Sequence, residues 1–528
     1  MRRFLLSLLA ASALVTTRAG GQRTDRPRLW GTLEPGHYAV GFRQLLLRDV
    51  TRPAVAAEDG GRVTSERGRQ MQIAIWYPAR PTTRRAMTYG EYIDRLSQEL
   101  DFGTIDEAKR RLAERKFIEL PAGLGGDTAA LRRALPRLRA LPTAARLDVA
   151  PATGRFPLVL FQEYRAPPSN SILAEYLASH GYVVASPTLK GTYDAAPETS
   201  VRGLETHAAD LRYVLGAVDS LAYVARDNVS ALGVGIAASG ALALQMRTPW
   251  MRALVSLEGG ITTALELGLL AATPYYDVAA VRVPMLAITA PHPSVDAARL
   301  EVFRYATRQL VHFPRMGEFW FLDYGMLERE VPGIIGAPRG DVSTGFEWGA
   351  RWVRLFLDAY VRSDGAALDT LISGAPLPGA PDGLFTVARR EGLPTPPTLA
   401  DLKQLLEHGG IQALDTLIDQ RHGADSQPIP NDYFAAVSSW LGNSGRDRTG
   451  VTRHALAVRR ATLYPRSARA RLALGLSAAS RDSSLARSEL NEALRLLPGD
   501  ADPALDAAAR ARLERQARDA LARLDATR

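Results

Sequence analysis

The stretch NVSALGVGIAASGALAL, residues 228–244, decides how the rest of the chain is interpreted. Val229–Gly233 is an apolar run typical of a buried strand, and Ala237–Arg247 has the apolar content of a packed helix. Gly235 lies between them, so the strand must turn into the helix within a few residues. So short a strand-to-helix connection is typical of an α/β sheet.

The same alternation of strand and helix extends from Phe156 to Phe321. Short apolar runs separated by helical segments indicate a mostly parallel sheet that helices cover on both faces. The other expected strands of this region are Phe156–Phe161, Tyr182–Ala185, Ala253–Leu257 and Met285–Thr289. The expected helices are Ser171–His180 and Val201–Val224, and one more helix, Gly345–Arg362, is expected after the region. Two or three further strands are expected near the front, at Val40–Phe42, Leu45–Leu47 and Met71–Tyr77.

The length of 528 residues exceeds what one hydrophobic core usually supports, so we expect two or three domains. Residues 22–372 form the expected α/β domain. Within it, the charged segment 87–141 has helical spacing and is interpreted as an inserted cap or flap. Residues 373–397 are rich in Gly and Pro and are interpreted as a linker. Strand signals are absent beyond it, so residues 398–528 are expected to be all-helical.

The expected helical region contains a repeated motif. Pro465 and Pro498 begin similar stretches 33 residues apart, close to the tetratricopeptide period of about 34. Small residues around Gly475 fit helices that pack closely in pairs. A tetratricopeptide-like array predicts a protein or peptide partner, whereas a plain helical bundle would only brace the preceding domain.

Residues 1–21 have the pattern of a signal peptide. Arg2 and Arg3 precede the apolar run Phe4–Val15, and small residues follow at Ala19–Gly21. The run is too short to span a membrane, and no later stretch reaches that length without charges or prolines. We therefore expect an exported protein, periplasmic or secreted, without an integral membrane segment; an uncleaved amphipathic N-terminus is the alternative.

Composition excludes several classes of protein. The sequence has no cysteine, which excludes a disulfide scaffold, an iron–sulfur protein and a thiol nucleophile. The formal net charge is +9, yet the basic residues are scattered, so no nucleic-acid partner is expected. Histidines are never spaced as metal ligands, and Gly233-Val234-Gly235 lacks the third glycine of a dinucleotide loop. We expect no metal and no cofactor.

Several motifs resemble those of the α/β-hydrolase superfamily, specifically its platelet-activating-factor acetylhydrolase and dienelactone-hydrolase-like branch. The resemblance covers about residues 36–362 and rests on YAVGFRQLLLRD, IAIWYPA, FPLVLF, LAEYLASHGYVVASP, NVSALGVGIAASGALAL, ALVSLEGG and PRMGEFWFLDYG. It implies the α/β-hydrolase fold. It also implies hydrolysis of small esters, acyl groups or lactones by a nucleophile, an acid and a histidine.

The nucleophile of such an enzyme lies on a sharp turn with the pattern G-x-S-x-G. The resemblance aligns Gly235 with the nucleophile, which supplies no hydroxyl. A register two residues later selects Ala237, which is equally inert. A shift of four residues selects Ser239 as a relocated nucleophile, but it moves the serine about a turn into the helix.

The other positions of the resemblance are also altered. The acid aligns with Glu258, and the histidine of a glycine–histidine–aromatic motif aligns with Glu318. A carboxylate is a poor base for a serine proton near neutral pH. The oxyanion turn aligns with a loop that carries Glu163 and Tyr164, where an acidic side chain is electrostatically adverse.

Four other histidines are candidates to replace the missing base. His312 is expected to be a packed strand residue, and His292 follows a strand where some relatives place their acid. His180 and His207 lie in expected helices and are interpreted as structural or exposed.

These observations favour a non-catalytic binding or scaffold protein with a degenerate catalytic triad, whose pocket takes a small ester or lipid-like ligand. One alternative is an active serine esterase that uses Ser239. Another is acid–base hydrolysis by Glu258 and Glu318. An aromatic cluster either lines the pocket or packs in the core; it comprises Phe319, Trp320, Phe321 and Tyr324.

Overall fold

The computed structural model describes residues 26–55, 68–162, 167–375, 377–422, 428–500, 502, 505 and 507–526. The expected signal peptide, residues 1–21, lies outside these residues, as do Glu163 and Tyr164. Within the described part, no helix has both the length and the hydropathy needed to cross a membrane.

The strands of the described residues form one ten-stranded sheet with the order β10-β9-β8-β7-β6-β4-β5-β2-β1-β3. Strands β4 to β9 run parallel to one another, whereas β2 runs antiparallel to both of its neighbours. The strands are β1 (Ala39–Asp49), β2 (Arg69–Ala79), β3 (Ala145–Leu147), β4 (Phe156–Gln162), β5 (Val183–Pro187), β6 (Val224–Val234), β7 (Ala253–Leu257), β8 (Met285–Thr289), β9 (Arg308–His312) and β10 (Thr386–Arg390).

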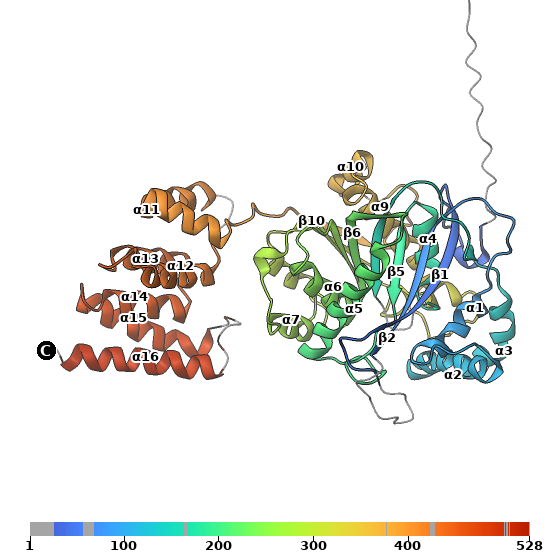
Figure 1. The fold of residues 1–528 in the computed structure, drawn as a ribbon, viewed down its shortest axis with the longest axis horizontal. Helices are drawn as coiled ribbons and strands as arrows, with labels where there is room; N and C mark the ends of the chain where they lie inside the picture. Colours follow the sequence, from blue (N-terminus) through green and yellow to red (C-terminus); the bar gives the residue numbers. More distant parts are fainter. Residues whose placement is uncertain are drawn as a thin grey trace, which may run out of the picture.

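Helices cover both faces of this sheet (Figure 1). Those of the first 373 residues are α1 (Tyr89–Asp94), α2 (Glu107–Gly123), α3 (Thr128–Ala140), α4 (Ser171–Ser179), α5 (Val201–Asp219), α6 (Ile236–Met246), α7 (Ala264–Ala271), α8 (Tyr324–Leu327), α9 (Val342–Tyr360) and α10 (Gly365–Ser373). The strand order, with the parallel strands β4 to β9, the antiparallel strand β2 and a helix after each central strand, is that of the α/β-hydrolase fold. The predicted fold class is therefore confirmed.

The alternation of side chains along β2 explains why two layers of helices form. Ala74 and Trp76 belong to one buried cluster together with residues of α4 and α9. Ile73 and Ile75 belong to a second cluster with residues of α5 and α6. Because successive side chains of a strand point to opposite faces, a strand that is apolar throughout needs cover on both sides.

One predicted segment needs correction. Residues 373–397 were interpreted as a linker, but Thr386–Arg390 forms β10, which pairs antiparallel with β9 at the edge of the sheet. The strand alternates between exposed and half-buried residues and ends in two arginines. An edge strand keeps one side in solvent, so it does not need the apolar run by which buried strands are recognised.

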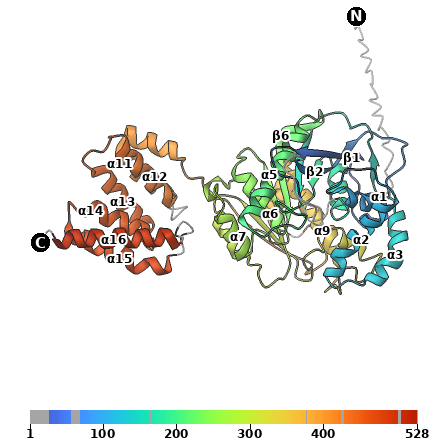
Figure 2. The same ribbon diagram turned by 60° about the horizontal axis from the view of Figure 1, so that its bottom comes forward.

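All regular elements described beyond residue 398 are helices, as predicted. They are α11 (Leu399–His422), α12 (Asn431–Asn443), α13 (Val451–Leu463), α14 (Ala468–Ala478), α15 (Ser483–Leu496) and α16 (Ala507–Ala526), with a short 3-10 turn at Leu497–Gly499. Consecutive helices pack against each other around their own buried leucines, set apart from the sheet (Figures 1 and 2). A Cβ added at Gly475 would lie 2.7 Å from Cγ of Leu490, so this glycine allows α14 and α15 to approach closely.

Candidate functional site

The turn between β6 and α6 is the local feature that creates the site. Gly235 follows the last residue of β6 and is the N-cap residue of α6, with φ 52° and ψ −132°. Its N–H donates a 3.0 Å hydrogen bond to the carbonyl oxygen of Leu257 on β7. The residue at the apex of the strand-to-helix turn is therefore Gly235, the position that the sequence aligns with a nucleophile.

Two neighbouring glycines are required by close backbone contacts. A Cβ on Gly233 would lie 2.4 Å from N and Cα of Ala238, and a Cβ on Gly260 would lie 1.8 Å from the carbonyl oxygen of Gly235. At Gly235 itself, a Cβ would meet no atom within 4 Å. The packing around the turn thus excludes side chains on both sides of the apex but leaves free space at the apex.

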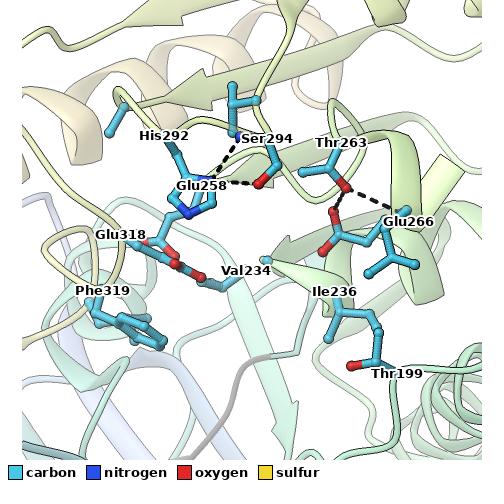
Figure 3. A pocket seen from close by; sticks show the side chains of 15 residues that line it. Thr199, Val234, Ile236, Glu258, Thr263, Glu266, His292, Ser294, Glu318 and Phe319 are labelled. Atoms are coloured by element: carbon cyan, nitrogen blue, oxygen red, sulfur yellow. Dashed lines mark hydrogen bonds between the residues drawn. The ribbon is translucent and has the colours of Figure 1, made fainter. Parts of the chain in front are cut away.

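This free space belongs to a cavity of about 300 Å³ at the carboxyl ends of the central strands (Figure 3). Such a volume is at the lower end of the range for small-molecule pockets. The described residues that line it are Thr199, Val234, Gly235, Ile236, Glu258, Thr263, Leu265, Glu266, Ala290, His292, Ser294, Val295, Glu318, Phe319 and Leu322. The structure therefore brings together Gly235, Glu258 and Glu318, the three residues that the sequence analysis aligned with a triad.

Glu258 is the most unusual of the lining residues. It follows β7 with a positive φ of 65°, and its N–H donates a 2.8 Å hydrogen bond to the carbonyl of Ile288. The residue is 8% exposed, and neither carboxyl oxygen has a hydrogen-bond partner among the described residues. Burial raises the pKa of Glu258 well above its ordinary value, and the nearby charge of Glu318 raises it further. The Glu258 carboxyl is therefore held in its protonated form at pH values where an exposed glutamate is ionised.

A third carboxyl group lies at the start of α7. Thr263 caps this helix by accepting a 3.2 Å hydrogen bond from the N–H of Glu266, and its hydroxyl also bonds to the Glu266 carboxylate. Burial raises the pKa of Glu266; the Thr263 hydrogen bond lowers it, and the charge of Glu318 raises it. The sequence analysis missed Glu266, although T-x-x-E before an apolar run is a recognisable helix start.

His292 is the only histidine that lines the cavity among the described residues. Its Nδ1 lies 2.7 Å from Oγ of Ser294 and accepts a 3.3 Å hydrogen bond from the Ser294 backbone N–H (Figure 3). Because a backbone N–H can only donate, the neutral ring carries its proton on Nε2. His292 thus brings an imidazole to the cavity, but from the loop after β8.

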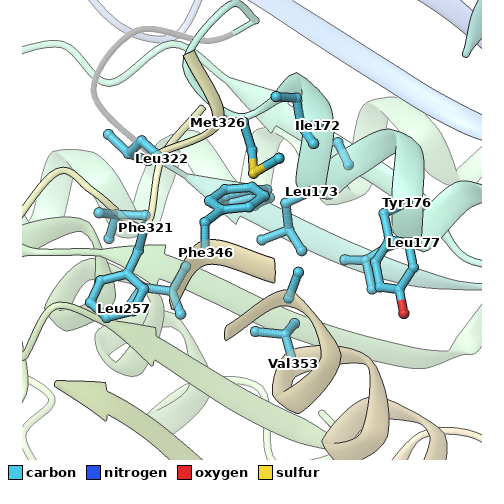
Figure 4. Packing of buried hydrophobic residues seen from close by; sticks show 14 of the residues in the cluster. Ile172, Leu173, Tyr176, Leu177, Leu257, Phe321, Leu322, Met326, Phe346 and Val353 are labelled. Atoms are coloured by element: carbon cyan, nitrogen blue, oxygen red, sulfur yellow. The ribbon is translucent and has the colours of Figure 1, made fainter. Parts of the chain in front are cut away.

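The aromatic cluster divides between the cavity and the core. Phe319 lines the cavity and has a positive φ of 52°, which is strained for a bulky residue. Trp320, Phe321 and Tyr324 are buried in the hydrophobic cluster of the sheet face that α4 and α9 cover. Figure 4 shows Phe321 in this packing.

The remaining candidates lie away from the cavity. Ser239 is fully buried within α6, and its hydroxyl donates a 3.0 Å hydrogen bond to the carbonyl of Gly260. Ser239 thus lies within the helix, where the shifted register was expected to place it, and Gly235 occupies the bend. His312 contacts Oγ1 of Thr289 at 3.0 Å, His180 contacts the Glu34 carbonyl at 3.1 Å, and His207 is buried between α5 and α6.

The segment 87–141 does not form the wall of the cavity. Its helices α1, α2 and α3 pack against each other, and Tyr92 contacts Phe42 and Trp76 of β1 and β2. Among the described lining residues, none comes from this segment. Within the same described part of the chain, no group of three or more His, Asp and Glu side chains is arranged to hold a metal ion.

Comparison with known proteins adds little to this description. No protein-family model and no curated protein matches the chain. Matching solved structures include a ferulic acid esterase from Streptomyces cinnamoneus, which is 17% identical, with a TM-score of 0.48 over 67% of this chain and 97% of that one. This likeness is too low to transfer an activity, and the fold assignment rests on the strand order.

Three glycine substitutions test the geometry of the turn. Gly260→Ala should lower the free energy of unfolding by more than about 3 kcal/mol, because its Cβ would collide with backbone. Gly235→Ala should cost only about 1–2 kcal/mol, the strain of a positive φ. Gly216→Ala, in the open part of α5, is the control and should stabilise by about 0.5–1 kcal/mol. Denaturant unfolding measures all three, and equal losses at Gly235 and Gly260 would contradict an open apex.

Glu258→Gln tests the burial of the carboxyl group. Above pH 4.5 the folded protein binds more protons at Glu258 than the unfolded chain does, so the stability of the native protein falls as pH rises through this window. The variant cannot ionise and should gain at least about 1 kcal/mol relative to the native protein between about pH 5 and about pH 8. Glu107→Gln, on the exposed face of α2, should follow the native curve. If the free energy of unfolding changed with pH in the same way for Glu258→Gln and the native protein, Glu258 would not be desolvated.

Proposed function

We propose that this chain is an exported binding protein that holds a small ligand in the cavity beside Gly235 and does not carry out acyl transfer. The observation that carries the proposal is the apex of the turn between β6 and α6. Gly235 stands there with free space around its missing Cβ, so the cavity is formed but the turn presents no nucleophile to it.

The chemistry of acyl transfer supports this proposal. A serine or cysteine must attack the carbonyl while an imidazole takes its proton. The sequence has no cysteine, and Ser239 is buried with its hydroxyl engaged by the Gly260 carbonyl. Glu318 cannot replace an imidazole as a proton shuttle. Its charge raises the pKa of Glu258 and would repel an oxyanion rather than stabilise it.

A role in binding is supported by the destabilising features of the residues that line the cavity. Glu258 and Phe319 both have positive φ, and the buried carboxyl of Glu258 has no hydrogen-bond partner in the part of the chain that the structure describes. Each of these features destabilises the folded chain. Such costs concentrate at functional sites, because a ligand that supplies the missing partner recovers the energy on binding.

The N-terminal and C-terminal regions support two further parts of the proposal, export and a protein or peptide partner. Residues 1–21 have the pattern of a signal peptide, which supports export to the periplasm or the medium. The helices α11–α16 pack in sequence in the manner of a helical repeat, which supports a tetratricopeptide-like surface for a protein or peptide partner.

A second candidate function is acid–base hydrolysis by the two carboxyl groups. It is favoured by one observation, the raised pKa of Glu258 beside Glu318, because unequal pairs of carboxyl groups serve as acid and base in glycoside hydrolysis. In this case the protein would hydrolyse nitrophenyl glycosides and Glu258→Gln would abolish the rate.

An esterase assay tests the leading proposal. The native protein should not hydrolyse short-chain p-nitrophenyl esters above the rate in buffer. The double variant Gly235→Ser with Glu318→His restores a hydroxyl and an imidazole beside Glu258, and a Cβ at position 235 has room. It should raise ester hydrolysis by about 10²-fold over the native protein, the range expected for general base catalysis.

The control for this assay carries the same two substitutions elsewhere, Gly216→Ser with Glu107→His on the open sides of α5 and α2. It should remain as inactive as the native protein. Hydrolysis by the native protein that disappears in Ser239→Ala would refute the proposal and establish a relocated nucleophile.

A further inference from the structure

The cavity is acidic on three sides. Its carboxyl groups come from three separate elements: Glu258 from the end of β7, Glu266 from the first turn of α7, and Glu318 from the segment after β9. Among the described lining residues there is no lysine or arginine. Within this described lining, the one basic group is His292, whose Nδ1 already accepts a hydrogen bond from Ser294.

Glu258 is the lining residue that most clearly indicates a bound ligand. Its carboxyl faces the cavity beside that of Glu318 (Figure 3), yet both oxygens are buried and no described residue forms a hydrogen bond with them. Glu266 differs, because Thr263 already bonds to its carboxylate. A buried polar group without a partner is costly, and a cation that reaches a carboxylate offsets more of this cost than a neutral donor does.

The rest of the lining fits an apolar body. Phe319, Leu322 and Leu265 line the same cavity. Its volume of about 300 Å³ corresponds to roughly ten water molecules in the liquid, so it holds a small molecule rather than a polymer. Because Gly235 has no side chain, a ligand can lie directly over the turn between β6 and α6.

We propose that the cavity binds a small primary amine, with its ammonium group between the carboxyl groups of Glu258 and Glu318 and its apolar body against Phe319 and Leu322. This inference rests on the proposed binding function and names the ligand class of that site. A carboxylate of the same size is disfavoured by the negative charge of Glu318, which also acts on Glu258 and Glu266. An alcohol lacks the charge that the site matches.

Binding of an amine should also release protons. Burial and the charge of Glu318 raise the pKa of Glu258 in the free protein well above its ordinary value. The other titratable groups that line the cavity are Glu266 on α7 and His292 after β8. An ammonium group placed against Glu258 favours its ionised form, so part of the bound population gives up the Glu258 proton to the buffer.

Three probes of equal length separate charge from size: hexylamine, hexanol and hexanoate. Isothermal titration of the full chain near pH 7.5 should show hexylamine binding at least about tenfold more tightly than hexanol, with hexanoate the weakest. Repeating the hexylamine titration in two buffers of different ionisation enthalpy should reveal proton release. Glu318→Gln and Glu258→Gln should each weaken the binding of hexylamine at least about fivefold, with little effect on the binding of hexanol.

The matched control is Glu107→Gln on α2, which should bind hexylamine as the native protein does. Glu258→Gln is expected to be at least as stable as the native protein, so a loss of binding in it is not a loss of fold. Equal affinities for hexylamine and hexanol, tighter binding of hexanoate, or no binding of hexylamine would overturn the amine proposal. Ester hydrolysis measured on the same samples tests the binding function separately: a preference for hexanol without ester turnover overturns only the ligand class.

Discussion

The site depends on one constraint, the close approach of backbone segments around the turn after β6. Gly260 packs against the carbonyl oxygen of Gly235, and Gly233 packs against the first turn of α6 at Ala238. Neither position has room for a Cβ. These contacts hold the apex of the turn next to the end of β7, and Glu258 follows directly from there. The geometry that usually presents a nucleophile is therefore maintained around a glycine.

Costs to stability are concentrated around the same cavity. Positive φ angles occur at Gly235, Glu258 and Phe319, and all three residues line it. Asp210, a fully buried carboxylate elsewhere in the domain, accepts hydrogen bonds from Arg52 and Arg69. Glu258 has no such partner within the described chain. This contrast is what supports a binding role, because a ligand can supply the missing partner while packing alone cannot.

The sequence predicted the central sheet well and its periphery less well. The strands Ala253–Leu257 and Met285–Thr289 have the predicted bounds, because they are buried on both faces and end at turns. The apex at Gly235 was predicted from the resemblance of residues 228–244 to a strand-to-helix turn of the pattern G-x-S-x-G. The edge strand β10 was missed, since its polar and half-exposed residues resemble a loop. The convergence of Glu266 and His292 with Glu258 could not be predicted, because it depends on how three loops meet at one end of the sheet.

Covalent labelling tests the central claim, an intact turn without a nucleophile, most directly. A fluorophosphonate reacts with the activated serine of serine hydrolases and leaves a phosphonyl group that intact-protein mass spectrometry detects. We expect no mass increase in the native chain under conditions that fully label an active serine esterase in the same tube. A stoichiometric adduct on the native chain, mapped by peptide sequencing to Ser239 or to any other serine, would contradict it.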